Sequence, residues 1–210
     1  MSIIVYAESW EGKFRKSTYE AVSYAKNMSE ILQQEVKSIS VGDISEEELK
    51  KLGIYGSSSV ESYPNISKSD GKSVAEIIKE HAQDSKFIVF SNTFNAKSIA
   101  PRVSAKLKAG IITNIISNLE NNNEPVFKRQ SFSSKAIEAV KLNTNQGVLS
   151  IAPNSFELSE KQLDCKISVN QKTTESDLNI TGKDINKGKI SLSEAEVIVS
   201  AGRGLKRPEN

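Results

Sequence analysis

The sequence contains a single cysteine, Cys165, and a single histidine, His81, among its 210 residues. One cysteine excludes an intramolecular disulfide and a cysteine-rich metal site. A cysteine nucleophile needs a neighbouring base, and the only histidine lies far from Cys165 in the sequence. We therefore interpret Cys165 as a partly buried structural residue and His81 as a packing residue. We predict no catalytic residue and no metal site.

The chain also lacks a dominant charge and a long apolar run. It has 28 Lys and Arg against 26 Asp and Glu, and the formal net charge of +2 is spread along the sequence. No basic stripe therefore predicts a nucleic acid partner. No apolar run approaches the roughly 18 residues of a membrane span, and no signal or transit peptide is seen at the amino terminus. These absences predict a cytoplasmic protein without membrane insertion.

Short apolar runs alternate with amphipathic stretches over the first half of the chain. Hydrophobic residues make up 37% of the sequence, which is enough for a packed core. The order β-α-β-α-β-α-β-α predicts parallel strands joined by right-handed crossovers. The predicted strands are Ile3–Ala7, Val36–Val41, Val60–Tyr63 and Phe87–Phe90.

The helix starts are predicted from capping residues. Ser17 and Glu20 have the spacing of a capping box. Ser45 precedes an acidic run that suits the positive end of a helix, and Asp70 or Ser73 opens the clearest amphipathic helix. The fourth helix is predicted from about Ser98 to Lys108, with Pro101 in its first turn.

The pattern changes after residue 110. Short β-rich segments follow at Ile111–Leu119, Pro125–Phe132, Ala136–Leu142 and Gly147–Ile151, and we expect them to form a small antiparallel extension that closes one side of the sheet. Residues 154–190 are polar and are interpreted as a connecting arm with one short strand, Cys165–Val169. Glu196–Ser200 is predicted to be a strand again. The expected domains are 1–190, an α/β domain, and 191–210, the first strand and turn of a second domain.

Two turns offer candidate binding residues. Gly202-Arg203-Gly204 follows a predicted strand, where backbone amides and a guanidinium can approach an anion together. The turn from Ser91 to Asn95 also leaves a strand and faces a helix start, so its amides could cradle a phosphate. Structural readings, a polar tail and a capping turn, remain open for both. The chain has no Walker A loop, no GxSxG elbow and no paired histidine motif.

Several segments resemble electron-transfer flavoprotein alpha subunits, in the right order along the whole chain. The most specific is the run from Val197 to Lys206 followed by Glu209-Asn210, which is similar to the motif that opens the family's flavin-binding domain. Ser133-Ser134-Lys135 stands where the family usually has a Gly-Asn-Ala turn. The supporting segments are Val5-Tyr6-Ala7-Glu8, Gly12-Lys13-Phe14, Ser91-Asn92-Thr93, Lys97, Pro101-Arg102 and Ala105.

The resemblance implies an open, mostly parallel α/β sheet of the nucleotide-hydrolase-like, Rossmann-like kind, without a nucleotide of its own. It implies a heterodimer with an electron-transfer flavoprotein beta subunit. The FAD of that heterodimer takes electrons from acyl-CoA or other dehydrogenases and passes them through a quinone reductase toward the respiratory chain. Arg203, with Gly202 and Gly204, matches the residues expected to touch FAD, whose main pocket would follow Asn210. We therefore expect this part of the chain to be non-catalytic and to hold FAD poorly or not at all.

Two other readings stay open. A free-standing nucleotide-binding α/β module would use the turn from Thr93 to Lys97 for a phosphate. A purely structural interaction domain would bind neither flavin nor nucleotide. Titration with FAD, ATP and AMP distinguishes all three.

Overall fold

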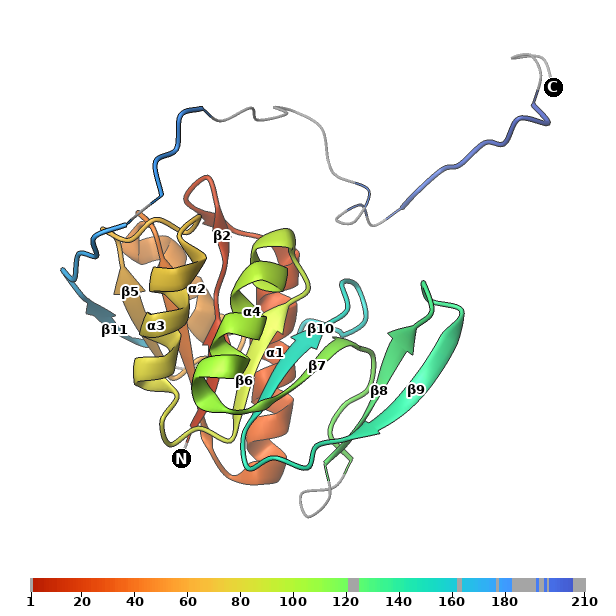
Figure 1. Cartoon of the computed structure of the whole chain (residues 1–210), viewed down its shortest axis with the longest axis horizontal. Coiled ribbons are helices and arrows are strands. Elements are labelled where there is room, and N and C mark those ends of the chain that lie inside the picture. Colours follow the sequence, from red (N-terminus) through yellow and green to blue (C-terminus); the bar gives the residue numbers. More distant parts are fainter. Residues whose placement is uncertain are drawn as a thin grey trace.

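The computed structural model describes residues 2–120, 125–161, 164–176, 178–182, 192, 195 and 197–205. The described part is a three-layer α/β structure in which a nine-stranded sheet lies between two pairs of helices (Figure 1). The strand order is β11-β5-β4-β1-β6-β10-β7-β8-β9. The predicted open, mostly parallel α/β fold is confirmed. The strands are β1 (Ser2–Tyr6), β4 (Glu35–Val41), β5 (Ser59–Tyr63), β6 (Phe87–Ser91), β7 (Gly110–Ile115), β8 (Val126–Ser131), β9 (Ala136–Lys141), β10 (Gly147–Ile151) and β11 (Lys166–Val169), and a separate small ribbon pairs β2 (Ser9–Trp10) with β3 (Lys13–Phe14).

The strands from β11 to β7 all run parallel, and each face of the sheet carries its own core. Successive side chains of a strand point to opposite faces, so Ile3 and Val5 join one core while Ile4 and Tyr6 join the other. The apolar runs of β1 and β6 are buried on both sides for this reason.

Two helices cover each face of the sheet. Helices α1 (Lys16–Leu32) and α2 (Glu46–Ile54) pack on the core that contains Ile3. Helices α3 (Gly71–His81) and α4 (Phe94–Leu107) pack on the core that contains Ile4. The predicted caps of α2 and α3 are confirmed, because the Ser45 side chain accepts from the Glu48 amide and the Asp70 carboxylate accepts from the Lys72 and Ser73 amides.

The predicted start of α1 is wrong. The helix begins at Lys16, with Arg15 at the N-cap position and no side-chain cap. Glu20 does not fold back to Ser17 as a capping box requires. Its carboxylate is buried and accepts from the backbone amide of Asn154 at 3.0 Å. A tertiary contact therefore replaces the local one.

The predicted start of α4 is also wrong. Thr93 caps the helix by accepting from the Ala96 amide at 3.1 Å, so the helix begins four residues before Ser98. Pro101 consequently lies inside the helix and not in its first turn. Pro101 is exposed, and as a proline it leaves one backbone carbonyl of the preceding turn without a helical donor.

The predicted antiparallel extension after residue 110 forms from β8 and β9, but β7 and β10 join the parallel part of the sheet instead. β10 inserts between β6 and β7 and runs parallel to both, and β7 ends at Ile115. Within the nine-stranded sheet, the antiparallel pairs are β7–β8 and β8–β9. All five residues of β10 are buried, and a strand with Val148, Leu149 and Ile151 on its two faces is stable where both faces are covered, which is the middle of the sheet.

The arm after β10 is bonded to both helical layers. On one side of the sheet the Ser159 amide donates to the Ser23 hydroxyl of α1 at 3.1 Å, and the Lys161 amide donates to the Ile54 carbonyl of α2 at 2.7 Å. The predicted short strand forms as β11 and pairs with β5 at the sheet edge. On the other side Lys172 contacts the Glu80 carboxylate of α3 at 2.6 Å. The described residues of the arm up to Lys172 are therefore part of the folded domain.

The predicted strand at Glu196–Ser200 is not formed in its described part. Val197, Ile198 and Val199 have no regular structure and are 81%, 55% and 95% exposed. A strand needs a neighbour for its backbone groups, and no described strand pairs with residues 197–200. Glu196 and the predicted domain boundary between residues 190 and 191 lie outside the described residues.

Candidate functional site

The strand order places a topological switch point between β1 and β6. These strands are neighbours, and the chain leaves β1 toward β4 on one side and β6 toward β10 and β7 on the other. Ligands of open α/β sheets bind at the carboxyl ends of the strands at such a point. Here the residues in that position are Glu8, after β1, and Asn92-Thr93, after β6.

The carboxylate of Glu8 bridges this point. Its Oε2 accepts from the Thr93 hydroxyl and its Oε1 accepts from the Asn95 side-chain amide at 2.7 Å. Its backbone carbonyl accepts from the Thr18 hydroxyl at 2.7 Å. A negative charge is favourable beside the amino end of α4. The chain therefore places a carboxylate of its own where the anionic group of a ligand would be expected.

A second group of hydrogen bonds joins the ends of β6, β10 and β7 at the same edge of the sheet. The side-chain amide of Asn92 donates to the side-chain oxygen of Asn114 at the end of β7, and the Ser150 hydroxyl donates to Asn92 Oδ1 at 3.5 Å. Asn114 has a left-handed backbone, φ 59°, which asparagine tolerates better than most residues. The pairing of β7 with β10 shifts register beside it. These asparagines hold the two strand ends together.

The charge of Glu8 acts on one buried neighbour. Burial first, and then the Glu8 carboxylate, raise the pKa of Tyr6 far above its ordinary value. Tyr6 packs on Phe90 with ring centroids 5.6 Å apart. The phenol therefore stays neutral beneath the edge and acts as a packing group.

Several donors of the turn from Thr93 to Lys97 are already engaged. The Thr93 hydroxyl and the Asn95 amide serve Glu8, and the Ala96 and Lys97 amides donate to Thr93. The ammonium of Lys97 lies 5.3 Å from the centroid of the Phe94 ring. A phosphate at this turn would have to displace Glu8, so the geometry favours the capping reading over the cradle.

The candidate residues Gly202, Arg203 and Gly204 are exposed and form a turn in which the Leu205 amide donates to the Gly202 carbonyl at 3.1 Å. A Cβ at either glycine would meet nothing within 4 Å. The structure places the three predicted cofactor-binding residues in one turn. An exposed turn in open space does not enclose a ligand, and flavins bind in pockets that bury most of their surface. The turn at residues 202–204 therefore does not by itself enclose a flavin.

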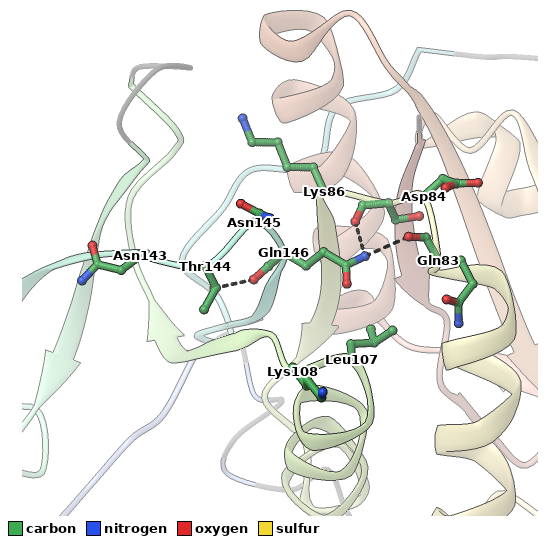
Figure 2. A pocket seen from close by; sticks show the side chains of 10 residues that line it. Gln83, Asp84, Lys86, Leu107, Lys108, Asn143, Thr144, Asn145 and Gln146 are labelled. Atoms are coloured by element: carbon green, nitrogen blue, oxygen red, sulfur yellow. Dashed lines mark hydrogen bonds between the residues drawn. The ribbon is translucent and has the colours of Figure 1, made fainter.

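The hollow shown in Figure 2 lies at the opposite, amino end of the parallel strands. It has a volume of about 1050 Å³ and is lined by the turn before β6, the end of α4 and residues 143–146. Its central side chain, Gln146, donates to the Ala82 and Ser85 carbonyls, both at 2.8 Å. Thr144 donates to the Gln146 carbonyl at 2.6 Å. These bonds fasten the loop before β10 to the end of α3, which is a structural role.

Cysteine and histidine are the residue types most often used in catalysis, and here Cys165 and His81 both have structural roles. Cys165 is half-buried, and burial together with the Asp164 charge raises the pKa of its thiol, which disfavours the reactive thiolate. The Nε2 atom of His81 lies 2.6 Å from the Tyr63 hydroxyl. Among the described residues there is no group of three or more His, Cys, Asp or Glu that could hold a metal ion. In the same part of the chain, no helix is long and apolar enough to cross a membrane.

Glu20 is a polar residue of the core. It is 1% exposed, and its Oε1 atom has no hydrogen-bond partner among the described residues. Burial raises the pKa of its carboxyl group, against the opposing effects of the Asn154 amide and of Lys16. Its contact with Asn154 fastens the start of the arm to α1, and the ring of Phe156 packs on Tyr24 beside it, with centroids 4.6 Å apart.

Sequence reasoning missed the roles of Glu8 and Glu20. The signal for Glu8 is its position directly after the first buried strand, where a polar residue reaches the carboxyl edge of the sheet. Glu20 fits a capping box locally, and no short-range pattern reveals the partner 134 residues away.

The fold and the carboxyl edge of the sheet together define the class of protein. It is a doubly wound α/β domain in which the chain's own side chains fill the edge where ligands of such sheets bind. The chain belongs to the electron transfer flavoprotein domain family, whose model matches residues 3–176. It is 28% identical to an electron transfer flavoprotein subunit alpha from Bacillus subtilis over 217 residues, and 26% identical to one from Syntrophomonas wolfei over 216 residues. These alignments cover 99% and 98% of this chain.

A further relative has a different name. The chain is 25% identical to a subunit of a lactate dehydrogenase (NAD(+),ferredoxin) from Acetobacterium woodii, across 97% of this chain and 51% of that protein. The chain spans 66% of the length of the Bacillus and Syntrophomonas alpha subunits. The relatives thus support an electron transfer flavoprotein role for this chain, and one of them is named as a subunit of a lactate dehydrogenase.

Proposed function

We propose that this chain acts as the alpha-type subunit of a heterodimeric electron-transfer flavoprotein. In this role FAD in the assembled protein takes electrons from a dehydrogenase, such as an acyl-CoA dehydrogenase, and passes them through a quinone reductase to the respiratory chain. The described α/β domain is the structural and subunit-interaction part, and the chain works in the cytoplasm. The observation that carries the proposal is the family match over residues 3–176.

The closed carboxyl edge supports a scaffold role for the domain. Glu8 engages Thr93 and Asn95 where a related nucleotide-binding sheet would hold its ligand. A domain that fills its own binding edge is suited to support a cofactor held elsewhere. We propose that Arg203 contacts an anionic group of FAD in the assembled flavoprotein, since a guanidinium forms strong paired hydrogen bonds with such groups.

The test is co-purification of this chain with an electron-transfer flavoprotein beta subunit. We expect a one-to-one complex on size exclusion, and no visible flavin absorbance from this chain alone because Arg203 stands in open space. Stoichiometric flavin on the isolated chain would contradict the assignment of FAD to other parts of the assembly. Failure of every tested beta subunit to form a complex would overturn the heterodimer.

A further inference from the structure

Two buried polar atoms lack a hydrogen-bond partner near the carboxyl end of the sheet. Neither the Oε1 atom of Glu20 nor the Oγ atom of Ser91 has a partner among the described residues. Glu20 is 1% exposed and Ser91 is 3% exposed, so both side chains are shielded from bulk solvent. Buried polar groups nearly always have a partner, which can be an ordered water molecule. Two such atoms in one part of the core therefore require an explanation.

Both side chains lie between α1 and the sheet. Successive strand residues point to opposite faces, so Ser91 shares its face of β6 with Phe87 and Val89. Phe87 and Val89 belong to the core beneath α1. Glu20 is one of the buried residues of α1 itself. The two unpartnered atoms are therefore on the same side of the sheet.

Two attachments place the start of α1 above the end of β6. The Thr18 hydroxyl, in the first turn of α1, donates to the Glu8 carbonyl after β1 at 2.7 Å. The Glu20 carboxylate accepts from the Asn154 amide after β10 at 3.0 Å. Because β6 lies between β1 and β10 in the sheet, the first turns of α1 cross the end of β6. Ser91 is the last residue of β6, so it lies beneath them.

The strand register also brings Ser91 close to the turn that Glu20 holds. Ser91 lies opposite Ile151, the last residue of β10. Asn154 follows Ile151 closely in the chain and donates to Glu20. The two unpartnered atoms therefore face one space between α1 and the ends of β6 and β10. They do not bond each other directly, since neither has a partner among the described residues.

The chemistry of the two atoms suits water better than a cation. A serine hydroxyl both donates and accepts, and a carboxyl oxygen accepts or, when protonated, donates. One water molecule can therefore bond both atoms, and buried waters make roughly two to four such bonds. A cation would need the ionised carboxylate. Burial raises the pKa of the Glu20 carboxyl, which disfavours that form.

We propose that Glu20 Oε1 and Ser91 Oγ hold one buried water molecule between α1 and the ends of β6 and β10. The site is a polar bridge that fastens the first turns of α1 to β6. It lies between the direct attachments that Thr18 and Asn154 make. The bridge is a property of this domain and does not depend on the flavoprotein role proposed above.

A double-mutant cycle in urea unfolding tests whether the two side chains are coupled. Glu20→Met and Ser91→Ala should each lower the folding equilibrium constant roughly tenfold, because each removes one end of the bridge. The double variant should lose clearly less than the product of the two single losses, since both ends are then gone. Loss of the Asn154 contact occurs in both Glu20→Met proteins and cancels in the cycle. Losses that simply multiply would overturn the bridge.

Ser150→Ala is the matched control. Ser150 is also 3% exposed and lies near the end of β10. It shares its face with Val148, which belongs to the core beneath α3 and α4, and its hydroxyl donates to Asn92. Its loss should multiply with that of Glu20→Met. Coupling as strong as that of Ser91 would show that the coupling arises without the bridge, and would overturn the proposal.

A crystal structure of the unchanged chain, at a resolution that shows ordered water, identifies the ligand and does not depend on the variants folding. We expect one water molecule within hydrogen-bond distance of Glu20 Oε1 and Ser91 Oγ. A direct bond between the two side chains, or an empty space between them, would overturn the proposal. A cation at this place, present only in buffers with sodium or potassium, would overturn it as well.

Discussion

Two glutamates decide how the parts of this domain are held together. Glu8 joins the end of β1 to the start of α4, and Glu20 joins α1 to the arm. Both carboxylates bond residues far away in the sequence. Their environments differ, since Glu8 faces donors at a helix start while Glu20 is enclosed in the core with one oxygen unpartnered among the described residues.

The buried carboxyl of Glu20 predicts a specific pH dependence of stability. Its pKa is raised in the folded state, so the folded protein binds the proton more tightly than the unfolded chain. As the pH rises above the ordinary value of 4.5 toward the raised value, the free energy of unfolding should fall. Glu20→Gln cannot ionise and should lack this decrease.

Urea unfolding of both proteins between pH 4 and pH 8, on the order of the window that a raised carboxyl spans, tests this. The difference between the two free energies of unfolding isolates Glu20 from the carboxyls with lowered pKa, which are Glu46, Glu48, Asp70 and Glu76. Parallel curves would show that Glu20 does not titrate differently on folding.

At the scale of elements, one helix start is decided by the local sequence and another by tertiary contacts. The structure confirms the start of α2 at Ser45, whose side chain accepts from the Glu48 amide at 3.3 Å. α1 has Arg15 at its N-cap position instead of the Ser17 that the sequence predicts. Ser45→Ala should lower the free energy of unfolding by about 1 kcal/mol because it removes a cap.

Ser17→Ala is the matched comparison, since Ser17 lies within the first turn of α1 and not at its cap. It should change stability by less than about 0.5 kcal/mol. Thermal or urea unfolding measures both. A loss at Ser17 as large as that at Ser45 would restore the capping box in solution.

At the scale of the whole molecule, the closed edge predicts that the domain does not respond to nucleotides. Glu8 uses the Thr93 and Asn95 donors, and its charge opposes a phosphate at the same place. Ligands that bind only the folded state raise the melting temperature. AMP or ATP at about 1 mM, a concentration in the range of common ligand affinities, should therefore leave the melting temperature of this chain unchanged.

This measurement tests the hypothesis that the chain is a free-standing nucleotide-binding module. A shift of several degrees that Lys97→Ala abolishes would establish it, and would show that a ligand displaces Glu8. A shift that survives Lys97→Ala would place the nucleotide away from the turn at residues 93–97.

The sequence by itself determined the parts that depend on short-range pattern. The apolar runs of β1 and β6 are strands because their residues suit burial on both faces. The predicted strands β4 and β5 also form, and the caps of α2 and α3 form with their nearest neighbours. The segments that resemble the flavoprotein family likewise lie within the run that the family model matches, or follow it.

Tertiary structure alone decided the rest, because pairing between distant segments leaves no local periodicity. The place of β10 between β6 and β7 depends on which strand needs two covered faces. The burial of Glu20 depends on an arm 134 residues away. The same holds for the closed edge, where a residue after β1 meets the first turn of α4 only once the two strands pair.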